Sequence, residues 1–116
     1  MARFVKGDVI IGWFPFSNAT GSKKRPALVL ASWLRSDAFQ QGEDYLLCMI
    51  STQNVNDPYS FALQVQDVEN GSLNRQSYVR PSYLFSADEA TISHKVGTLK
   101  AEKLALVVEA IHRLVS

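Results

Sequence analysis

The sequence predicts a mainly β (α+β) domain, in which a small and strongly curved antiparallel sheet or barrel is closed by one helix. Several short apolar runs, rich in β-branched and aromatic residues and separated by polar turns, indicate strands. One amphipathic segment near the C-terminus indicates the helix. A length of 116 residues fits one core, so residues 1–116 are expected to form a single domain.

The first half of the chain contains three apolar runs that are expected to be strands: residues 9–14, 27–33 and 45–50. Pro26 precedes the second run, a place where its missing N–H does least harm to a sheet. The polar stretch 17–24 is expected to be an exposed loop, and the polar stretch 34–43 a connection.

In the second half the strand signals are shorter: residues 61–66, 77–80, a piece near 84–85, and 94–99. Residues 61–66 alternate between apolar and polar side chains, which predicts a half-exposed strand. Asn70-Gly71 is a turn signal. Pro81 is expected to interrupt the strand between 77–80 and 84–85.

The terminal helix is predicted by apolar residues that recur at the i, i+3, i+4, i+7 spacing. The residues of this face are Leu104, Val107, Val108, Ile111, Leu114 and Val115. Charged and polar residues lie between them, so we expect this one face of the helix to pack against the sheet.

Composition excludes several classes of protein. Twelve Lys and Arg residues against 11 Asp and Glu give a net charge of +1, which is not typical of a duplex-DNA binder, although it leaves a local basic patch open. A single cysteine, Cys48 within an apolar run, excludes an intrachain disulfide and is expected to be a core thiol. His94 and His112 alone cannot complete a structural zinc site, and no cofactor is implied.

The chain contains no signal for a membrane or for export. Its longest apolar run, residues 9–16, is far shorter than the roughly 20 residues that cross a bilayer. Asp8 stands where the apolar segment of a signal peptide would begin. We therefore expect a cytoplasmic protein.

Polar residues at the ends of the expected strands are the candidates for chemistry. Residues 23–25 (Lys-Lys-Arg) close the first loop, residues 51–53 (Ser-Thr-Gln) close the third strand, and Arg75 and Arg80 flank Tyr78. If the sheet curves so that these ends meet, they form a basic pocket for a phosphodiester, which guanidinium groups bind in a bidentate manner. From composition alone a solvated turn is the stronger interpretation, because three basic residues in a loop usually face solvent. Periodicity does not show whether the ends of the strands converge.

The order of several segments resembles the PemK/MazF toxins of bacterial toxin–antitoxin systems. Residues 7–10 (Gly-Asp-Val-Ile), 14–17 (Phe-Pro-Phe-Ser) and 21–30 (from Gly-Ser-Lys-Lys-Arg-Pro onward) resemble the N-terminal signature of that family. Residues 50–53 (Ile-Ser-Thr-Gln) are similar to its second motif. Segments in the C-terminal half that are similar to the family are 77–80, 84–85, 95–99 and the closing helix.

The resemblance implies an SH3-like antiparallel barrel with helices, and a homodimer. It also implies sequence-specific cleavage of single-stranded RNA without a metal. A cognate small antitoxin is the implied protein partner, with a tail that occupies the RNA groove and with which the toxin forms a DNA-binding complex.

Position by position, the resemblance implies roles for four catalytic residues. Arg25 stands at the catalytic arginine of the family, directly before a proline. Ser51 stands where the family usually has a catalytic threonine, with Thr52 next to it, and Arg80 falls on a basic position that some members use at the scissile phosphate. The RNA-binding candidates are Lys23, Lys24, Gln53, Arg75, Phe16, Tyr78 and Ser82.

The sequence departs from the family at three places. Ser51 replaces a threonine but keeps a hydroxyl. Two residues after Arg80, where those members have an acid, this chain has Ser82. A histidine that some members carry in the first loop is missing here.

The chemistry explains these residue types. The 2′-hydroxyl of RNA can attack the adjacent phosphorus, which leaves a 2′,3′-cyclic phosphate and a 5′-hydroxyl. Arg25 and Arg80 would neutralise the developing charge while the hydroxyls donate hydrogen bonds. Because a guanidinium keeps its proton at all working pH values, Arg25 is expected to stabilise charge first and to donate a proton only second.

Aromatic rings could stack on the bases of the RNA. We expect Trp13 and Phe14 to lie in the core, since they sit inside an apolar strand. Phe16 and Tyr78, beside polar loops, are open to either stacking or packing.

Two other functions stay open. The same fold could poison gyrase, as the CcdB inhibitors do, but this chain ends in Arg-Leu-Val-Ser at 113–116 rather than in their short aromatic tail. The barrel could instead be catalytically silent and bind RNA or an antitoxin without cutting, which the serines at 51 and 82 make plausible.

Overall fold

The structure is a computed structural model that describes residues 3–14, 23–36, 41–53 and 56–116. Within these residues it contains seven strands, one α-helix and two short 3-10 helices. Their bounds are β1 (Asp8–Phe14), β2 (Lys23–Ser36), β3 (Gln41–Ser51), β4 (Phe61–Leu63), η1 (Val65–Asp67), β5 (Val68–Glu69), β6 (Ser77–Asp88), η2 (Glu89–Thr91), β7 (Ile92–Leu99) and α1 (Ala101–Val115).

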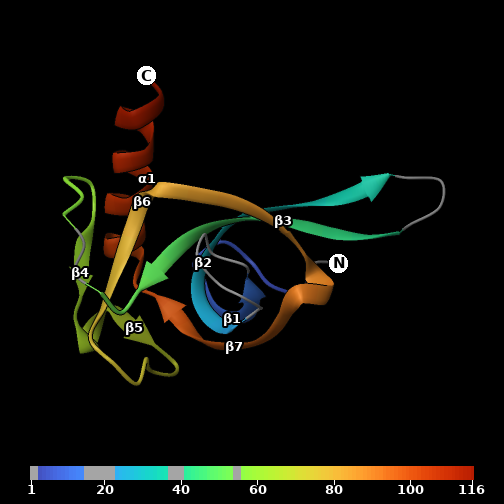
Figure 1. Cartoon of the computed structure of the whole chain (residues 1–116), viewed down its shortest axis with the longest axis horizontal. Helices are drawn as coiled ribbons and strands as arrows, with labels where there is room; N and C mark the ends of the chain where they lie inside the picture. The colour runs from blue at the N-terminus through green and yellow to red at the C-terminus, as the bar shows by residue number, and fades with distance from the viewer. Residues whose placement is uncertain (1–2, 15–22, 37–40, 54–55) are drawn as a thin grey trace.

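The strands form one antiparallel sheet in the order β4-β6-β3-β2-β1-β7-β5. Figure 1 shows that the sheet curls into a nearly closed barrel, with α1 against one side and the β2–β3 hairpin extending away from the other. The predicted mainly β barrel with a terminal helix is therefore confirmed. Because long strands that curl strongly must bend, the ladders contain register shifts, for example between Val29 and Ala31 of β2.

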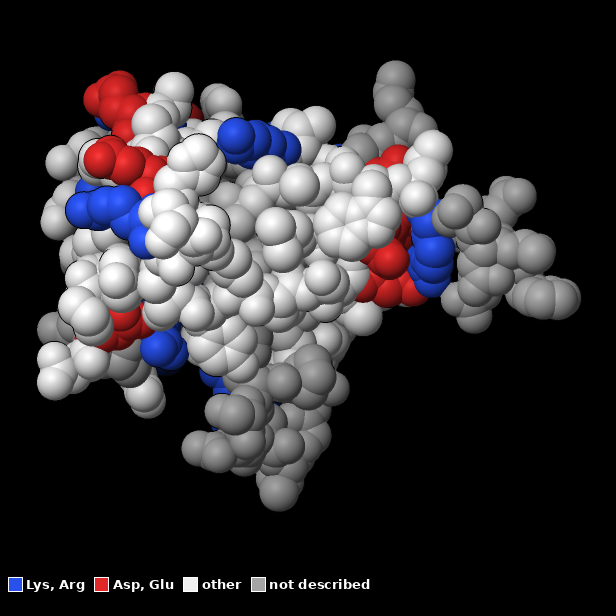
Figure 2. Space-filling model, turned by 90° about the horizontal axis from the view of Figure 1, so that it is seen from above, with Lys and Arg blue, Asp and Glu red and all other residues white. Residues whose placement is uncertain are grey.

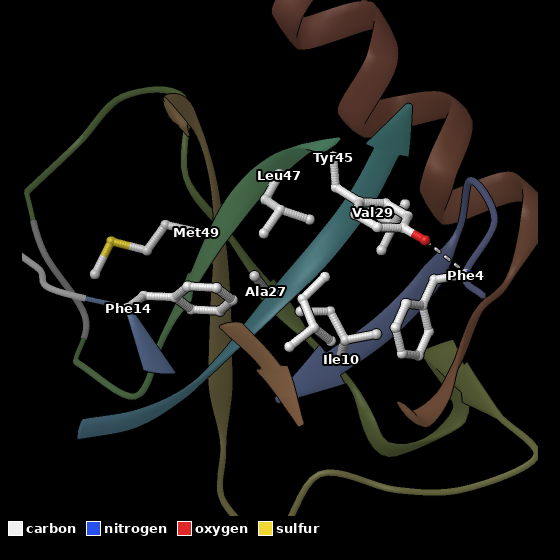
Figure 3. Packing of buried hydrophobic residues seen from close by; sticks show 9 residues of the cluster. Phe4, Ile10, Phe14, Ala27, Val29, Tyr45, Leu47 and Met49 are labelled. Atoms are coloured by element: carbon white, nitrogen blue, oxygen red, sulfur yellow. Dashed lines mark hydrogen bonds between the residues drawn. The ribbon is translucent and has the colours of Figure 1, made fainter. Parts of the chain in front are cut away.

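Two hydrophobic cores lie on the two faces of the curled sheet. Ile10 pairs with Ala27 and both belong to the core inside the barrel, together with Leu47 and Met49 (Figure 3). Their neighbours in sequence point the other way, since side chains alternate along a strand. The second core contains Val9, Leu28, Cys48, Ile50 and Val79 with Val107 of α1.

The helix packs with most of its predicted face. Val107 is fully buried, and Leu104 and Ile111 pack against the second core. Val115 was expected on this face, but its side chain is 75% exposed because the last turn of α1 projects beyond the sheet (Figure 1). Ala110 is buried and was not among the predicted residues, since a small side chain adds little to an apolar pattern.

The expectation that residues 34–43 form a connection was wrong at both ends of this stretch. Residues 34–36 continue β2 and residues 41–43 continue β3, so that Leu34 pairs with Glu43. This outer part of the hairpin is stabilised by charges, since Arg35 contacts Asp44 at 3.5 Å and Asp88 at 3.1 Å. A polar two-stranded ribbon that lies outside the barrel has no apolar alternation for sequence analysis to detect.

Two further expectations about strands were wrong. Pro81 does not break the strand, because β6 runs from Ser77 to Asp88 and absorbs the proline in a bulge: Met49 pairs with Arg80, whereas Cys48 pairs with Leu84. The strand expected over 61–66 ends at Leu63. The Asp67 carboxylate then accepts a hydrogen bond of 2.7 Å from the Gln64 backbone N–H and closes the turn of η1.

Candidate functional site

The strand registers bring Arg25, Ser51 and Arg80 to one face of the sheet. Arg25 lies two residues before Ala27 on β2, so alternation directs it to the inner face, on which Ala27 belongs to the barrel core. Ala27 pairs with Met49 of β3, and Met49 pairs with Arg80 of β6. Ser51 lies two residues beyond Met49, again on the inner face.

These residues lie in two adjacent rows of cross-strand neighbours at one end of the barrel. Arg80 belongs to the row of Met49, and Arg25 belongs to the row of Ser51. Ser51 pairs directly with Tyr78, and continuing the β2–β3 register by two residues brings Arg25 opposite Ser51. Arg25 is half-buried, with its Nε atom out of contact with solvent. The strand ends that carry these residues therefore do meet. The backbone pairing shows it, whereas strand periodicity alone does not.

Arg80 is held on several sides. Its Nε lies 3.3 Å from Oδ2 of Asp57, and its Nη1 lies 3.8 Å from the sulfur of Met49. The Cζ atom is 5.6 Å from the centre of the Tyr83 ring, a cation–π distance. The guanidinium therefore has a defined position, although 23% of its side chain is exposed to solvent.

Asp57, in the segment between β3 and β4, is a site residue that the sequence analysis missed. Its carboxylate accepts hydrogen bonds from the Ser82 hydroxyl and from the backbone N–H of Tyr59 at 2.9 Å. Its side chain is only 9% exposed. The Ser82 hydrogen bond lowers the pKa of Asp57 most; burial opposes this effect, and the Tyr59 amide and Arg80 add to it.

No local pattern reveals this contact. Asp57 and Arg80 are 23 residues apart, with no periodic relation between them. The one signal available was an acid directly before a proline, within the polar stretch that follows the third strand.

The hydroxyl of Ser51 closes a tight turn at the end of β3. Its Oγ accepts a hydrogen bond of 3.0 Å from the Gln53 N–H and donates one of 3.2 Å to the Gln53 carbonyl. Ser51 is half-buried, while Thr52 and Gln53 are exposed. The turn thus presents a fixed hydroxyl, a second hydroxyl and an amide at the edge of the inner face.

Lys23 and Lys24 were expected in a loop, but they are the first residues of β2. Because neighbouring side chains alternate, Lys23 belongs to the face of Arg25 and Lys24 to the opposite one. Lys24 lies 5.5 Å from the ring centre of Trp13, its cross-strand partner.

Phe14 is buried as expected, whereas the expectation that Trp13 lies in the core was wrong, because its side chain is 47% exposed. Trp13 stands on the outer face and is not a member of the second core.

The other predicted site residues are spread more widely. Tyr78 is half-buried opposite Ser51, and Ser82 is exposed and bonded to Asp57. Arg75 precedes β6 and is exposed, beside a hollow that Leu63 and Gln76 also line. Phe16 and the loop residues 17–22 lie outside the described residues.

Cys48 is a core residue, as expected. It is fully buried, and its Sγ lies 3.1 Å from the carbonyl oxygen of Arg80. Burial raises the pKa of this thiol to about 12, so at neutral pH it is protonated and is no nucleophile.

Two kinds of feature are absent from the described residues. His, Cys, Asp and Glu side chains nowhere form a group of three or more that could bind a metal ion within this part of the chain. Among the same residues, no helix has the length and apolar character required to span a membrane.

The fold and the site together define a small antiparallel barrel that carries guanidinium and hydroxyl groups at one end, groups of the kind that bind phosphate. The sequence model for the PemK-like, MazF-like toxin of type II toxin–antitoxin systems matches residues 5–115. The chain therefore belongs to this toxin family, as its segments had indicated.

Solved structures agree on the fold. The Mycobacterium tuberculosis toxin MazF-mt6 is 16% identical and superposes with a TM-score of 0.64, over 91% of this chain and 93% of that one. An endoribonuclease in complex with its cognate antitoxin, from a mycobacterial species, is 13% identical with a TM-score of 0.65, over 96% of this chain and 93% of that one. Comparison with curated protein sequences gave no match.

Proposed function

We propose that this protein is a toxin endoribonuclease that cleaves single-stranded RNA at specific sequences without a metal. Family membership supports an RNA-cleaving toxin. The observation that carries the proposal is the placement of Arg25, Ser51 and Arg80 on one inner face at one end of the barrel. A single phosphodiester bound there would meet two permanent positive charges and a fixed hydroxyl.

In the proposed reaction the 2′-oxygen of the ribose forms a bond to phosphorus while the bond to the 5′-oxygen breaks. The 2′-hydroxyl loses its proton and the departing 5′-oxygen gains one, which leaves a 2′,3′-cyclic phosphate and a 5′-hydroxyl. Negative charge gathers on the phosphorane oxygens, and the guanidinium groups of Arg25 and Arg80 stabilise it. The Thr52 hydroxyl would donate a further hydrogen bond to these oxygens. The Ser51 hydroxyl would do so once its proton turns from the Gln53 carbonyl to the phosphate.

The neighbouring groups would hold the RNA strand on either side of the cut. Lys23 stands on the same face as Arg25 and is suited to a flanking phosphate. Tyr78 is placed beside Ser51, where its ring could stack on a base. Gln53 and Arg75, both exposed, extend the polar surface along which a single strand would lie.

The partners of the toxin also belong to this proposal. A cognate antitoxin would cover the basic end of the barrel, as the family implies, and a second copy would complete a homodimer. Figure 2 shows a face whose centre is free of Lys, Arg, Asp and Glu side chains, with charges toward its left and right ends and a basic side chain at its upper edge. Depletion of charge is typical of the centre of an interface between proteins.

One assay separates the candidate functions. Purified protein is incubated with a mixed-sequence single-stranded RNA in excess chelator, and the new ends are mapped. We expect cyclic-phosphate ends that disappear with Arg25→Ala and persist with Arg113→Ala, an exposed arginine in the last turn of α1. Intact RNA with inhibited gyrase would support the CcdB-like function, and intact RNA that stays tightly bound would support a silent barrel.

A further inference from the structure

We infer that Asp57 is a positioning residue, which holds the Arg80 guanidinium in the orientation that receives the scissile phosphate. The inference rests on the proposed RNA cleavage. It assigns a specific task to a carboxylate that lies beside a basic site and would otherwise repel the substrate.

The contact uses only one edge of the guanidinium. Asp57 accepts from Nε at 3.3 Å, whereas the substrate-binding fork of an arginine also has the N–H groups of Nη1 and Nη2. Among the described residues, Nη1 meets the weak sulfur acceptor of Met49, at 3.8 Å. An anion is a far stronger acceptor than a thioether, so a phosphate could take these donors without displacing Asp57.

Asp57 is itself fixed in place. The Ser82 hydroxyl and the Tyr59 N–H bind its carboxylate, and its backbone carbonyl accepts from Ser60 N–H at 3.1 Å and Ser60 Oγ at 3.0 Å. With a side chain only 9% exposed, Asp57 cannot follow Arg80 into solvent. The segment between β3 and β4 is thereby tied to β6, and the arginine rotamer is selected before RNA binds.

The chemistry gives Asp57 no proton to carry. Its pKa is lowered, so the carboxylate is a weak base at neutral pH. Loss of the Asp57 charge should therefore act only through Arg80 and lower kcat. Because this loss removes a negative charge beside the RNA, KM should stay unchanged or fall.

The test is Asp57→Asn, which keeps the shape and removes the charge. We expect kcat for RNA cleavage to fall about tenfold to a hundredfold, since misplacing a reacting group by about 1 Å costs that much. KM should not rise. A merely structural role would raise KM or lower the amount of folded protein together with kcat.

The matched control is Asp88→Asn. Asp88 also accepts from an arginine, Arg35 at 3.1 Å, and from a backbone N–H, that of Ala90 at 3.0 Å, and its pKa is lowered as well. Asp88 is the last residue of β6, whereas the proposed site lies near the first residue of this strand, Ser77. Asp88→Asn should leave kcat unchanged.

A double-mutant cycle tests whether Asp57 acts through Arg80. In an Arg80→Ala background, Asp57→Asn should cost no further rate, because the group it positions is gone. Equal losses in both backgrounds would overturn the inference. If Asp57→Asn does not fold, Ser82→Ala removes the first support of the carboxylate and should lower kcat several-fold at constant KM; an unchanged kcat would overturn the inference too.

The outcomes separate the two proposals. Wild-type protein that leaves RNA intact refutes the cleavage and this inference with it. Wild-type protein that cleaves, with Arg80→Ala impaired and Asp57→Asn normal, refutes the positioning role alone.

Discussion

Ser51, at the end of β3, lies directly opposite Tyr78 of β6. A hydroxyl that can donate to phosphate thus has an aromatic ring as its cross-strand neighbour, on the face where Arg25 stands. In the proposed cleavage of a single strand, the hydroxyl would contact the phosphate and the ring would stack on the adjacent base. The pairing therefore fixes where the RNA backbone and the first stacked base would meet.

Removing the Ser51 hydroxyl should slow cleavage far more than it weakens binding. Loss of one preorganised donor to the transition state costs about a hundredfold in rate. We expect this loss for Ser51→Ala in single-turnover cleavage, with RNA affinity changed by less than about threefold. Ser86→Ala, an exposed serine farther along β6, serves as the control. Full activity of Ser51→Ala would remove this hydroxyl from the reaction.

Lys23 and Lys24 should contribute to binding through charge. Removing one lysine that binds a phosphate should reduce the salt slope of binding by about 1, so Lys23→Ala with Lys24→Ala should weaken affinity more at low salt than at high salt. Because Lys24 lies over Trp13 on the outer face, Lys23→Ala alone should account for most of the change. Titrations at several salt concentrations, with Lys6→Ala as control, measure this slope. A slope equal to that of the wild type would place the start of β2 outside the RNA site.

The packing of α1 against the sheet can be tested by introducing an aspartate at a buried position and, separately, at an exposed one. Val107→Asp places an unpaired charge in a fully buried site and should cost at least about 4 kcal/mol, enough to unfold most of the protein. Val115→Asp should leave the free energy of unfolding within about 0.5 kcal/mol, because this side chain is 75% exposed. Thermal unfolding followed by circular dichroism gives both values. Soluble, folded Val107→Asp would contradict the packing of the helix.

The lowered pKa of Asp57 predicts how stability depends on pH. A carboxyl that binds protons less tightly when folded stabilises the protein above its unfolded pKa of about 3.9, and this contribution is lost as the pH falls through the folded pKa. The difference in unfolding free energy between wild type and Asp57→Asn should thus be constant from about pH 7 to 5 and shrink below about pH 4. Urea unfolding at a series of pH values measures it. A difference that does not depend on pH would show that the charge of Asp57 adds nothing to stability.

Some features were predictable because they repeat locally. The face of α1 follows from 3.6-residue periodicity, and the burial of Cys48 follows from its apolar neighbours. The outer half of the β2–β3 hairpin was not predictable, since its stability comes from pairing across strands and from the ion pairs of Arg35. A bulge at Pro81 was equally hidden, because it depends on how β3 and β6 pair.

Only part of the candidate site was predicted from the sequence, and Asp57 was missed. Arg25, Ser51 and Arg80 were candidates because they lie at strand ends, and the family pattern gave them their roles. Only the strand registers bring them to one face. The contact of Asp57 with Arg80 depends on the path of the segment between β3 and β4, and no periodic pattern in the sequence predicts that path. Ser82, where some members have an acid, turned out to bind this carboxylate.

The most direct measurement is a crystal structure with a short RNA that carries the mapped cleavage sequence and a 2′-O-methyl group at the cut, which blocks the attacking oxygen. The scissile phosphate should lie within about 3 Å of both the Arg25 guanidinium and the Ser51 hydroxyl, with Arg80 still bound to Asp57. A phosphate bound on the opposite face, beside Lys24 and Trp13, would contradict the proposed active site.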